Sequence, residues 1–390
     1  MKITVTNKAA KKIRRGYPLI QREDLQQVPK ELPTSWVTFV DHKGQALAKG
    51  YLGTQNKGIG WVLTWQETID SAFLLQVFSK SKEQRSCYQL EAGTTAYRLF
   101  NGEGDGIGGV VIDRYQDYAV FSWYNATLYA HQGEIVAAFQ QVYPEILGAY
   151  EKIRFASSSL PESQHLYGQQ APEPLLVQEN SVTYATYLNE GLMTGIFLDQ
   201  KEVRGKLADG LAAGKKVLNM FSYTGAFSVA AAMGGASATT SVDLAKRSLV
   251  KTQEQFSVNQ LPLDQNKIVV MDVFDYFKYA LRKELSYDVI ILDPPSFARN
   301  KKRVFSVAQH YGELVKDAAA LLADQGTLIA STNAANLSMV KYARMVKEAL
   351  REAQVSFTIT DTYQLPADFQ VSPLFPEGNY LKVLFIQINK

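Results

Sequence analysis

Cysteine is nearly absent from this sequence: Cys87 is the only one in 390 residues. A single thiol excludes an intramolecular disulfide framework and a zinc site built from cysteines. Histidine is scarce too, and the spacing of the four histidines is typical of neither a metal site nor a catalytic triad: His42, His131, His165 and His310. We therefore expect no bound metal ion.

Long apolar runs are also missing. No stretch reaches the roughly 20 residues that a membrane-spanning helix needs, and the polar, basic N-terminus is no signal peptide. With 46% hydrophobic and 20% charged residues, the composition is that of a globular protein. We expect a cytoplasmic protein without a membrane partner, and a chain of this length predicts two or three domains.

Acidic residues are missing from the first 22 positions, although the net charge of the whole chain is only +3. The same segment is rich in lysine and arginine, and such a basic cluster suits contacts to nucleic-acid phosphates. For this first cluster, a charge run that is merely solvated is an equally good interpretation. A second cluster directly follows an Asp-Pro-Pro motif, and its position favours RNA. The candidate RNA-binding residues are Lys11, Lys12, Arg14, Arg15, Arg299, Lys301, Lys302 and Arg303.

Three composition regimes predict three domains. Residues 1–70 hold short alternating runs punctuated by glycine, as in a small β-barrel or sandwich. Residues 71–188 begin with a helical segment at 71–90 and predict an α+β domain. It has strands near 97–100, 109–112, 118–121 and 152–155, a helix at 133–142, a loop at 157–174 and a hairpin with its turn at 179–181.

Residues 189–390 alternate strands and helices, which predicts an α/β domain with a mostly parallel, Rossmann-like sheet. The predicted strands are 216–220, 238–242, 267–271, 288–292, 326–331, 354–360 and 381–388, and the predicted helices are 199–209, 225–233, 245–258, 273–284, 307–322 and 336–351.

The fourth of these strands ends in Asp293, Pro294, Pro295, Ser296 and Phe297. Ligands of such sheets bind beyond the carboxyl ends of the strands. A stiff turn with carboxylate and carbonyl acceptors, beside an aromatic ring, suits a nucleobase that has been turned out of its stack. The motif therefore predicts an enzyme that modifies nucleic acid.

A nucleotide cofactor is predicted by the other strand ends. The loop at 219–225 stands where a dinucleotide-binding fold has several glycines, yet it has only Gly225. Pyrophosphate needs that close backbone approach, so NAD and FAD fit poorly. Asp243, Asp272 and Asp293 end three successive strands and can bind a ribose, an adenine amino group and a sulfonium. Each could instead cap a helix, but the ordered set favours S-adenosylmethionine.

Several segments resemble the 23S ribosomal RNA large-subunit methyltransferase I family over essentially the whole chain. Those that resemble its class I methyltransferase and central domains are 217–225 (VLNMFSYTG), 234–236 with 241–243 (SVD), 292–297 (LDPPSF), 97–106, 112–115 and 195–200 (GIFLDQ). Residues 15–18 (RGYP) and 50–53 (GYLG) resemble its PUA barrel, which implies an RNA-binding domain at the N-terminus.

The resemblance also implies roles for single residues. Gln200 and Arg204 would close over the methionine of the cofactor, and Asn219, Phe221 and Ser222 would line its loop. With the strand-end acids, the expected cofactor-binding set is Gln200, Arg204, Asn219, Phe221, Ser222, Gly225, Asp243, Asp272 and Asp293.

One departure from the family decides the chemistry that we expect. Members that make 5-methylcytosine carry a cysteine after the fifth strand, because carbon 5 becomes nucleophilic only when a thiolate adds to the ring. Here Asn333 stands at about that place, and Cys87 lies far upstream. The segment at 293–303 also resembles the guanine-N7 methyltransferases of ribosomal RNA, whose fifth strand likewise ends in asparagine.

We therefore expect an RNA methyltransferase that acts on (23S) ribosomal RNA. It would transfer the methyl group directly to a base nitrogen, without a covalent intermediate. The expected catalytic residues are Asp293, Pro294, Pro295, Phe297 and Asn333. Three alternatives stay open: a cytosine-C5 methyltransferase with an atypical site, a Rossmann oxidoreductase, and a non-catalytic RNA-binding assembly factor. A homodimer is compatible with the sequence but is not required by it.

Overall fold

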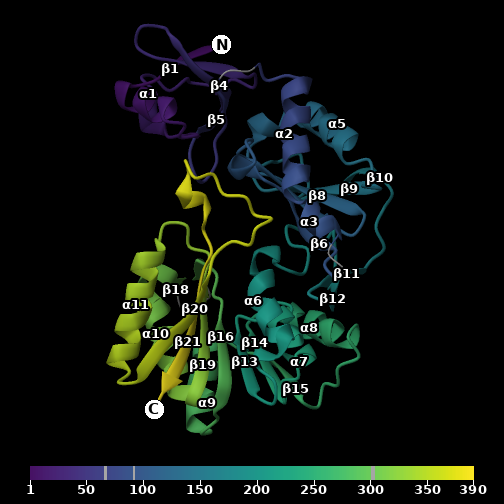
Figure 1. Cartoon of the computed structure of the whole chain (residues 1–390), viewed down its shortest axis with the longest axis vertical. Coiled ribbons are helices and arrows are strands. Elements are labelled where there is room, and N and C mark those ends of the chain that lie inside the picture. Colours follow the sequence, from purple (N-terminus) through teal and green to yellow (C-terminus); the bar gives the residue numbers. More distant parts are fainter. Residues whose placement is uncertain (66–67, 91–92, 300–303) are drawn as a thin grey trace. The chain divides into compact units, whose positions relative to one another are not determined.

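The computed structural model describes residues 1–65, 68–90, 93–299 and 304–390, which form two compact units (Figure 1). Unit 1 comprises Met1–Val177, Thr186–Thr194 and Ala367–Gly378, and unit 2 comprises Gln178–Ala185, Gly195–Pro366 and Asn379–Lys390. Unit 1 holds both N-terminal sheets. The division into three domains at 70 and 188 remains a proposal about folding units. Among the helices within the described ranges, none is long and apolar enough to cross a membrane.

The first sheet of unit 1 has the strand order β1-β3-β4-β5-β2. Its elements are β1 (Lys2–Thr4), α1 (Asn7–Arg14), β2 (Leu19–Ile20), η1 (Arg22–Asp24), β3 (Val37–Val40), β4 (Ala46–Leu52) and β5 (Gly60–Thr64). The helix was not predicted, because half of its eight residues are basic. Thr6 caps it by accepting a hydrogen bond from Ala9 N, and Ala9, Ala10 and Ile13 bury its apolar side. The basic run is therefore the outer face of a helix.

The second sheet of unit 1 has the order β10-β9-β8-β7-β6. Its elements are α2 (Ser71–Gln84), α3 (Ser86–Leu90), β6 (Ala96–Asn101), η2 (Gly102–Gly104), β7 (Val110–Tyr115), β8 (Tyr118–Trp123), α4 (Ala126–Tyr129), α5 (Gln132–Val142), β9 (Gly148–Ile153) and β10 (Ser163–Gly168). The predicted loop at 157–174 was wrong where β10 lies. This edge strand has no apolar alternation, and its pairing with β9 supplies the order that its sequence does not indicate.

A hairpin of β11 (Leu175–Glu179) and β12 (Val182–Thr186) follows, with its turn at the predicted place. Asn180 and Ser181 both have positive φ, 51° and 62°, as a two-residue hairpin turn requires.

Unit 2 is built on a seven-stranded sheet with the order β15-β14-β13-β16-β19-β21-β20. Its strands are β13 (Lys216–Met220), β14 (Ala238–Asp243), β15 (Asn266–Val270), β16 (Tyr287–Leu292), β19 (Leu322–Thr332), β20 (Ser356–Tyr363) and β21 (Lys382–Asn389). The first five are parallel, and β21 runs antiparallel between β19 and β20. The order of the strands reverses between β13 and β16, and this switch point is where ligands bind in such sheets.

Helices cover both faces of this sheet. They are η3 (Leu198–Gln200), α6 (Lys201–Lys206), η4 (Leu207–Leu211), α7 (Ala226–Met233), α8 (Arg247–Ser257), α9 (Val273–Arg282), α10 (Val307–Leu321) and α11 (Met339–Glu352). The remaining elements are η5 (Pro376–Gly378), which belongs to unit 1, and the antiparallel pair of β17 (Phe297–Arg299) and β18 (Val304–Ser306). Strand residues alternate between two cores: Leu218, Ile290 and Leu328 pack with α9, α10 and α11, whereas Val217, Val289 and Ile329 pack with α6 and α7. The predicted parallel α/β domain is confirmed.

Candidate active site

The predicted acidic residues do lie at the carboxyl ends of neighbouring parallel strands. Asp243 is the last residue of β14, Asp272 follows β15 by two positions, and Asp293 directly follows β16. All three side chains are partly buried. Because β13 and β16 flank the switch point, the loop after β13 and the turn after β16 are next to each other along the same sheet edge.

The loop after β13 has an unusual backbone. Phe221, Tyr223 and Gly225 alternate in the left-handed region, with φ of 59°, 53° and 77°. Such conformations are costly for phenylalanine and tyrosine and are typically kept at ligand sites. The loop is held from β14, since Ser222 N donates to Val242 O at 3.0 Å and Tyr223 N donates to Asp243 Oδ2 at 2.9 Å.

Gly225 cannot be replaced without cost. Besides its positive φ, a Cβ atom at this position would lie 2.5 Å from Thr252 Cγ2. The residue begins α7, and its amide donates to Ser222 O at 2.7 Å. Gly225 is therefore required by the turn and by the close approach of α8.

Asp243 is a structural carboxylate with acceptor capacity to spare. Its Oδ2 accepts from Tyr223 N, and its Oδ1 accepts from Ala245 N at 2.8 Å. Each oxygen of a carboxylate can accept two hydrogen bonds. The side chain is thus fixed at the strand end and can still accept from a hydroxyl pair of a ligand.

Asp272 has the capping role that was the alternative interpretation. Its Oδ1 accepts from Phe274 N at 3.0 Å and from Asp275 N at 3.4 Å, and it is the N-cap of α9. A helix-capping role does not exclude ligand binding by Asp272. It does, however, explain an aspartate at this position even if Asp272 binds no ligand.

Asp293 lies in a small polar cluster with Gln200 and Ser331. Gln200 Nε2 donates to Ser331 Oγ at 2.7 Å, and both side chains hydrogen-bond to the Asp293 carboxylate. The pKa of Asp293 is raised to about 6, chiefly by burial and to a smaller extent by the negative charge of Asp199, while the hydrogen bonds from Ser331 and Gln200 and the charge of Arg204 lower it. Asp199 itself accepts from Tyr380 Oη at 2.9 Å. The carboxyl group is therefore poised to change charge near neutral pH.

Arg204 is buried and bound to protein groups. Its Nε and Nη2 donate to the two oxygens of Glu179 at 2.7 and 2.8 Å, and Nη2 also donates to Phe197 O at 2.7 Å. Both members of the ion pair are almost fully buried. In this geometry Arg204 fixes the segment that precedes α6, which carries Asp199 and Gln200.

The Asp-Pro-Pro turn meets the end of β19. Ser296 Oγ donates to Asn333 Oδ1 at 2.5 Å, so Asn333 lies directly beside the motif as its predicted role requires. Pro294 is buried, whereas Pro295 and Asn333 are exposed. The Phe297 side chain is 62% exposed and offers a free aromatic face. The two strand ends thus present acceptors, an amide and a ring together.

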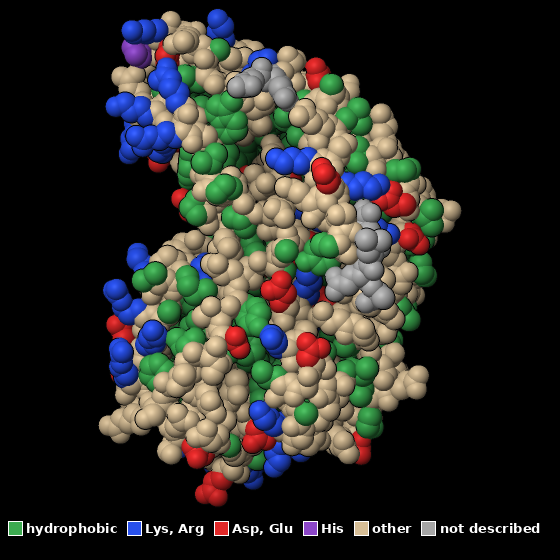
Figure 2. All heavy atoms as spheres, in the orientation of Figure 1, with side chains coloured by type: hydrophobic (Ala, Val, Ile, Leu, Met, Phe, Trp, Pro, Cys, Tyr) green, Lys and Arg blue, Asp and Glu red, His purple; other side chains and the backbone are tan. Residues whose placement is uncertain are grey.

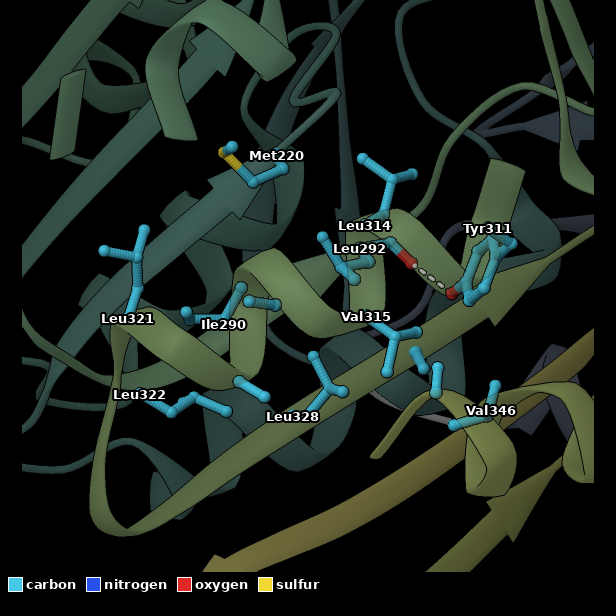
Figure 3. Close-up of a cluster of buried hydrophobic side chains, with 14 of the residues drawn as sticks. Met220, Ile290, Leu292, Tyr311, Leu314, Val315, Leu321, Leu322, Leu328 and Val346 are labelled. Carbon is cyan, nitrogen blue, oxygen red and sulfur yellow. Dashed lines mark hydrogen bonds between the residues drawn. The ribbon is translucent and has the colours of Figure 1, made fainter. Parts of the chain in front are cut away.

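Tyr311 on α10 links the carboxyl ends of β16 and β19. Tyr311 Oη donates to Ser331 O at 2.9 Å and lies 3.3 Å from Leu292 O, the contact drawn in Figure 3. It accepts from Tyr342 Oη at 2.8 Å. Leu292 and Ser331 immediately precede Asp293 and the 332–333 segment, so the tyrosine pair holds the base of the candidate site.

The chain is similar to known proteins in both of its parts. A family model described as S-adenosylmethionine-dependent methyltransferase matches residues 157–384, and a PUA-like domain model matches residues 3–65. The chain is 47% identical to the Bacillus subtilis "Putative ribosomal RNA large subunit methyltransferase YwbD", covering 99% of this chain and 100% of that protein. It is 30% identical to ribosomal RNA large subunit methyltransferase I of Yersinia pseudotuberculosis, covering 95% of each.

The solved structures include one described as "SMU.776, a putative methyltransferase complexed with SAH". It superposes with a TM-score of 0.93 and 48% identity, and the match covers 99% of this chain and 100% of that one. The chain belongs to the S-adenosylmethionine-dependent methyltransferase family. Its predicted fold, a PUA-like domain before a class I methyltransferase domain, and its predicted cofactor are confirmed.

Two buried oxygens test whether this methyltransferase can hold its cofactor. Asn219 Nδ2 donates to Ser228 Oγ at 3.1 Å, but Asn219 Oδ1 has no hydrogen-bond partner among the described residues. Gln200 Oε1 is likewise buried without one. Unsatisfied buried acceptors are costly and call for a donor. A methionine ammonium and an adenosine supply such donors, so the residues fit S-adenosylmethionine.

The basic residues divide into paired and free groups. Lys12 Nζ lies 3.1 Å from Asp24 Oδ1 and Arg14 Nη2 lies 2.7 Å from Asp41 Oδ2. Lys11 and Arg15 are exposed. Figure 2 shows Lys and Arg side chains gathered over α1. The predicted Lys301, Lys302 and Arg303, and the side chain of Arg299, lie outside the described residues.

Sequence reasoning missed four residues of this site: Glu179, Asp199, Ser331 and Tyr380. Asp199 stands in the quoted GIFLDQ segment, beside Gln200, and that adjacency was the available signal. Glu179 is at a hairpin turn and Ser331 is inside a strand. Nothing in their local sequence indicates that folding brings them to Arg204 and Asp293.

Proposed function

We propose that this methyltransferase transfers a methyl group from S-adenosylmethionine to a nitrogen of a base in large-subunit ribosomal RNA. The RNA substrate is supported by the names of the two relatives, a putative ribosomal RNA large subunit methyltransferase and a ribosomal RNA large subunit methyltransferase I. The residues of the site support nitrogen as the target atom.

The proposal rests chiefly on the Ser296–Asn333 hydrogen bond. With Asn333 Oδ1 accepting from Ser296, the amide Nδ2 is directed elsewhere and can donate to a ring nitrogen or carbonyl of a base. The Asp293 carboxylate and the Pro294 carbonyl can accept from an amino or imino group. Phe297, exposed beside them, gives the base a surface on which to stack.

A nitrogen target follows from the missing thiol. Methylation of cytosine carbon 5 needs a thiolate that adds to the ring, and the only cysteine, Cys87, is on α3 in unit 1. Unit 2, which carries Asp293 and Asn333, has none. A base nitrogen has its own lone pair, so the protein needs only to orient it and exclude water.

The cofactor supplies an electrophilic methyl group on a positively charged sulfur. In the transfer the nitrogen lone pair forms the new N–C bond while the S–C bond breaks. A nitrogen that carries a proton must also lose it, and the Asp293 carboxylate is the acceptor that this pocket provides. Its pKa of about 6 leaves it ionised at neutral pH and able to take up a proton.

Nucleoside analysis of ribosomal RNA tests the proposal. RNA from cells with and without this protein is digested and compared by mass spectrometry, and an Asp293→Asn variant is the matched control. We expect one N-methylated nucleoside that requires the protein and is absent with the variant. A 5-methylcytosine that depends on the protein would exclude the nitrogen target. An unchanged RNA would exclude the substrate.

RNA binding by α1 is tested separately. Lys11 and Arg15 are exposed and can each neutralise a phosphate, and each such contact adds about 0.7–0.9 to the salt dependence of log K. Replacing both with glutamine should lower the slope by about 1.5. Arg14→Gln, which removes a charge already paired with Asp41, is the control and should change it less. If the wild type, the double variant and Arg14→Gln had the same salt dependence of log K, the basic residues of α1 would be a solvated helix face and not an RNA-binding site.

A further inference from the structure

Lys382 is a buried lysine at the start of β21 that has no role in the site described so far. Its side chain is 3% exposed, and it pairs in the sheet with Thr332, the residue before Asn333. Nζ donates to Ala334 O at 2.9 Å and to Tyr380 O at 2.7 Å. Within the ranges that the structure describes, no ion pair involves this ammonium.

A buried cation without a counter-charge is unfavourable for the fold. Burial lowers the pKa of Lys382 to about 8, which shows that the charged form is disfavoured here. The flanking residues, Leu381 and Val383, are buried and apolar, so a third apolar residue would suit this strand better. A lysine at this position therefore points to a function other than stability.

The two carbonyl groups that Lys382 binds lead to opposite sides of the candidate site. Ala334 directly follows Asn333, whose amide meets the Asp-Pro-Pro turn. Tyr380 donates through its hydroxyl to Asp199 Oδ2 at 2.9 Å, and the charge of Asp199 acts on Asp293. One ammonium thus connects the segment that carries Asn333 with the tyrosine that orients Asp199.

We infer that Lys382 is a positioning residue of the methyl-acceptor pocket: its ammonium holds the 333–334 segment and Tyr380 so that Asn333 and Asp199 keep their places beside Asp293. The inference rests on the proposed function for the identity of the pocket. Lys382 does not contact the reacting atoms itself. Charge-assisted hydrogen bonds are about twice as strong as neutral ones, so loss of the proton loosens both contacts.

Other titratable groups lie on the surrounding elements. They are Asp199 before α6, Asp293 after β16, Tyr311 on α10, Tyr342 on α11, Tyr363 on β20 and Tyr380 itself. Burial lowers the pKa of Lys382, whereas burial raises the pKa values of Tyr311 and Tyr342. The two tyrosines therefore titrate at higher pH than Lys382. We therefore expect loss of the proton from the Lys382 ammonium to produce an alkaline change near pH 8.

The test is Lys382→Met in the full-length protein. We expect kcat for RNA methylation to fall at least tenfold, S-adenosylmethionine affinity to stay within twofold, and hydrogen exchange of the 333–336 amides to accelerate. The wild type should lose activity as pH rises through about 8, and the variant should lack this alkaline limb. Lys152→Met is the matched control, because Lys152 is also buried with a pKa lowered to about 8, but lies in unit 1 and binds Gly191 O and Ser163 Oγ. It should retain the alkaline limb.

A folded Lys382→Met protein with wild-type kcat, or with the alkaline limb intact, would overturn the inference. If the variant does not fold, the wild type alone decides: protection of the 333–336 amides, corrected for intrinsic exchange, should fall between pH 7 and pH 9, and constant protection would overturn the inference. A wild type that methylates no RNA would instead refute the proposed function, and the exchange measurement would still decide the role of Lys382.

Discussion

Gln200 Nε2 donates a 2.7 Å hydrogen bond to Ser331 Oγ, and so joins the end of η3, just before α6, to the end of β19. Both side chains also bind the Asp293 carboxylate, yet burial still raises the pKa of that group to about 6. The cluster therefore stabilises a carboxylate that the fold disfavours. A buried carboxylate with a raised pKa is expected where the charge serves catalysis and not stability.

Asp293→Asn should abolish methyl transfer without destabilising the protein. The folded-state pKa lies above the unfolded value, so the favourable contribution of Asp293 is present below about pH 4 and is lost as pH rises through about 6. At pH 7.5 the wild type bears the cost of a buried charge and the neutral variant does not. Urea unfolding at pH 5 and pH 7.5 should show that the free energy of unfolding of the variant, relative to that of the wild type, is higher at pH 7.5 than at pH 5. A difference that is the same at both values would contradict the assignment.

The pH dependence of kcat/KM should have an acidic limb at about 6. The proposed roles of Asp293 need the ionised form, and kcat/KM reports the pKa values of the free enzyme. Binding of the cationic cofactor favours the carboxylate, so the corresponding limb of kcat should lie at lower pH. Any trace of activity that Asp293→Asn retains in a sensitive assay should not vary across this range. A limb that persists in the variant would belong to another group.

Gly225→Ala should reduce affinity for S-adenosylmethionine at least tenfold. The new Cβ meets Thr252 Cγ2 at 2.5 Å, and φ of 77° adds a strain of about 1 kcal/mol. Gly235→Ala is the control, since its φ is 87° but the nearest atom to the added Cβ is 3.7 Å away. It should lose only the stability that its own positive φ costs, measured by thermal unfolding, and keep its affinity by titration calorimetry. Equal affinity losses would show that strain, not the shape of the loop, is responsible.

The methyltransferase domain was predictable because its signals are local. β13, β15 and β16 contain short apolar runs, and polar residues lie within two positions of the carboxyl ends of β13, β14, β15 and β16, so Asn219, Asp243 and Asp293 could be found from the sequence. The order of the last two strands could not. The sequence suggests that the apolar 381–388 segment closes the sheet, whereas β21 inserts between β19 and β20. Such an order is set by long-range pairing.

Long-range contacts also explain the missing site residues. Glu179 is 25 positions before Arg204, and Ser331 is 131 positions after Gln200. No local pattern indicates a partner at such a distance. Similarly, α1 was hidden because its lysines and arginines read as a charge run, while only Ala9, Ala10 and Ile13 show the helical spacing.

Glu179→Ala should destabilise the protein strongly. It leaves the Arg204 guanidinium buried and without its carboxylate, a change that typically costs about 3–5 kcal/mol. Glu352→Ala is the control, because it removes the partner of Lys316 from an exposed pair and should change little. Urea unfolding of both variants gives the comparison. Similar, small losses would mean that Arg204 finds another partner when Glu179 is absent.

Tyr311→Phe should slow methyl transfer while cofactor affinity is kept. The hydroxyl binds Ser331 O and reaches Leu292 O, the two carbonyls that precede the residues of the acceptor pocket. Its loss leaves buried acceptors unsatisfied, which costs about 1–3 kcal/mol, and lets the ends of β16 and β19 move apart. We expect kcat to fall several-fold.

Tyr342→Phe supplies the comparison, because it removes only the hydroxyl that donates to Tyr311 and touches neither carbonyl. Its effect should be smaller, and the double variant should be no slower than Tyr311→Phe alone, since both act through the same hydroxyl. Stopped-flow single-turnover assays of the three variants would measure this. Additive losses would show that Tyr342 reaches the acceptor pocket by a route that does not pass through Tyr311.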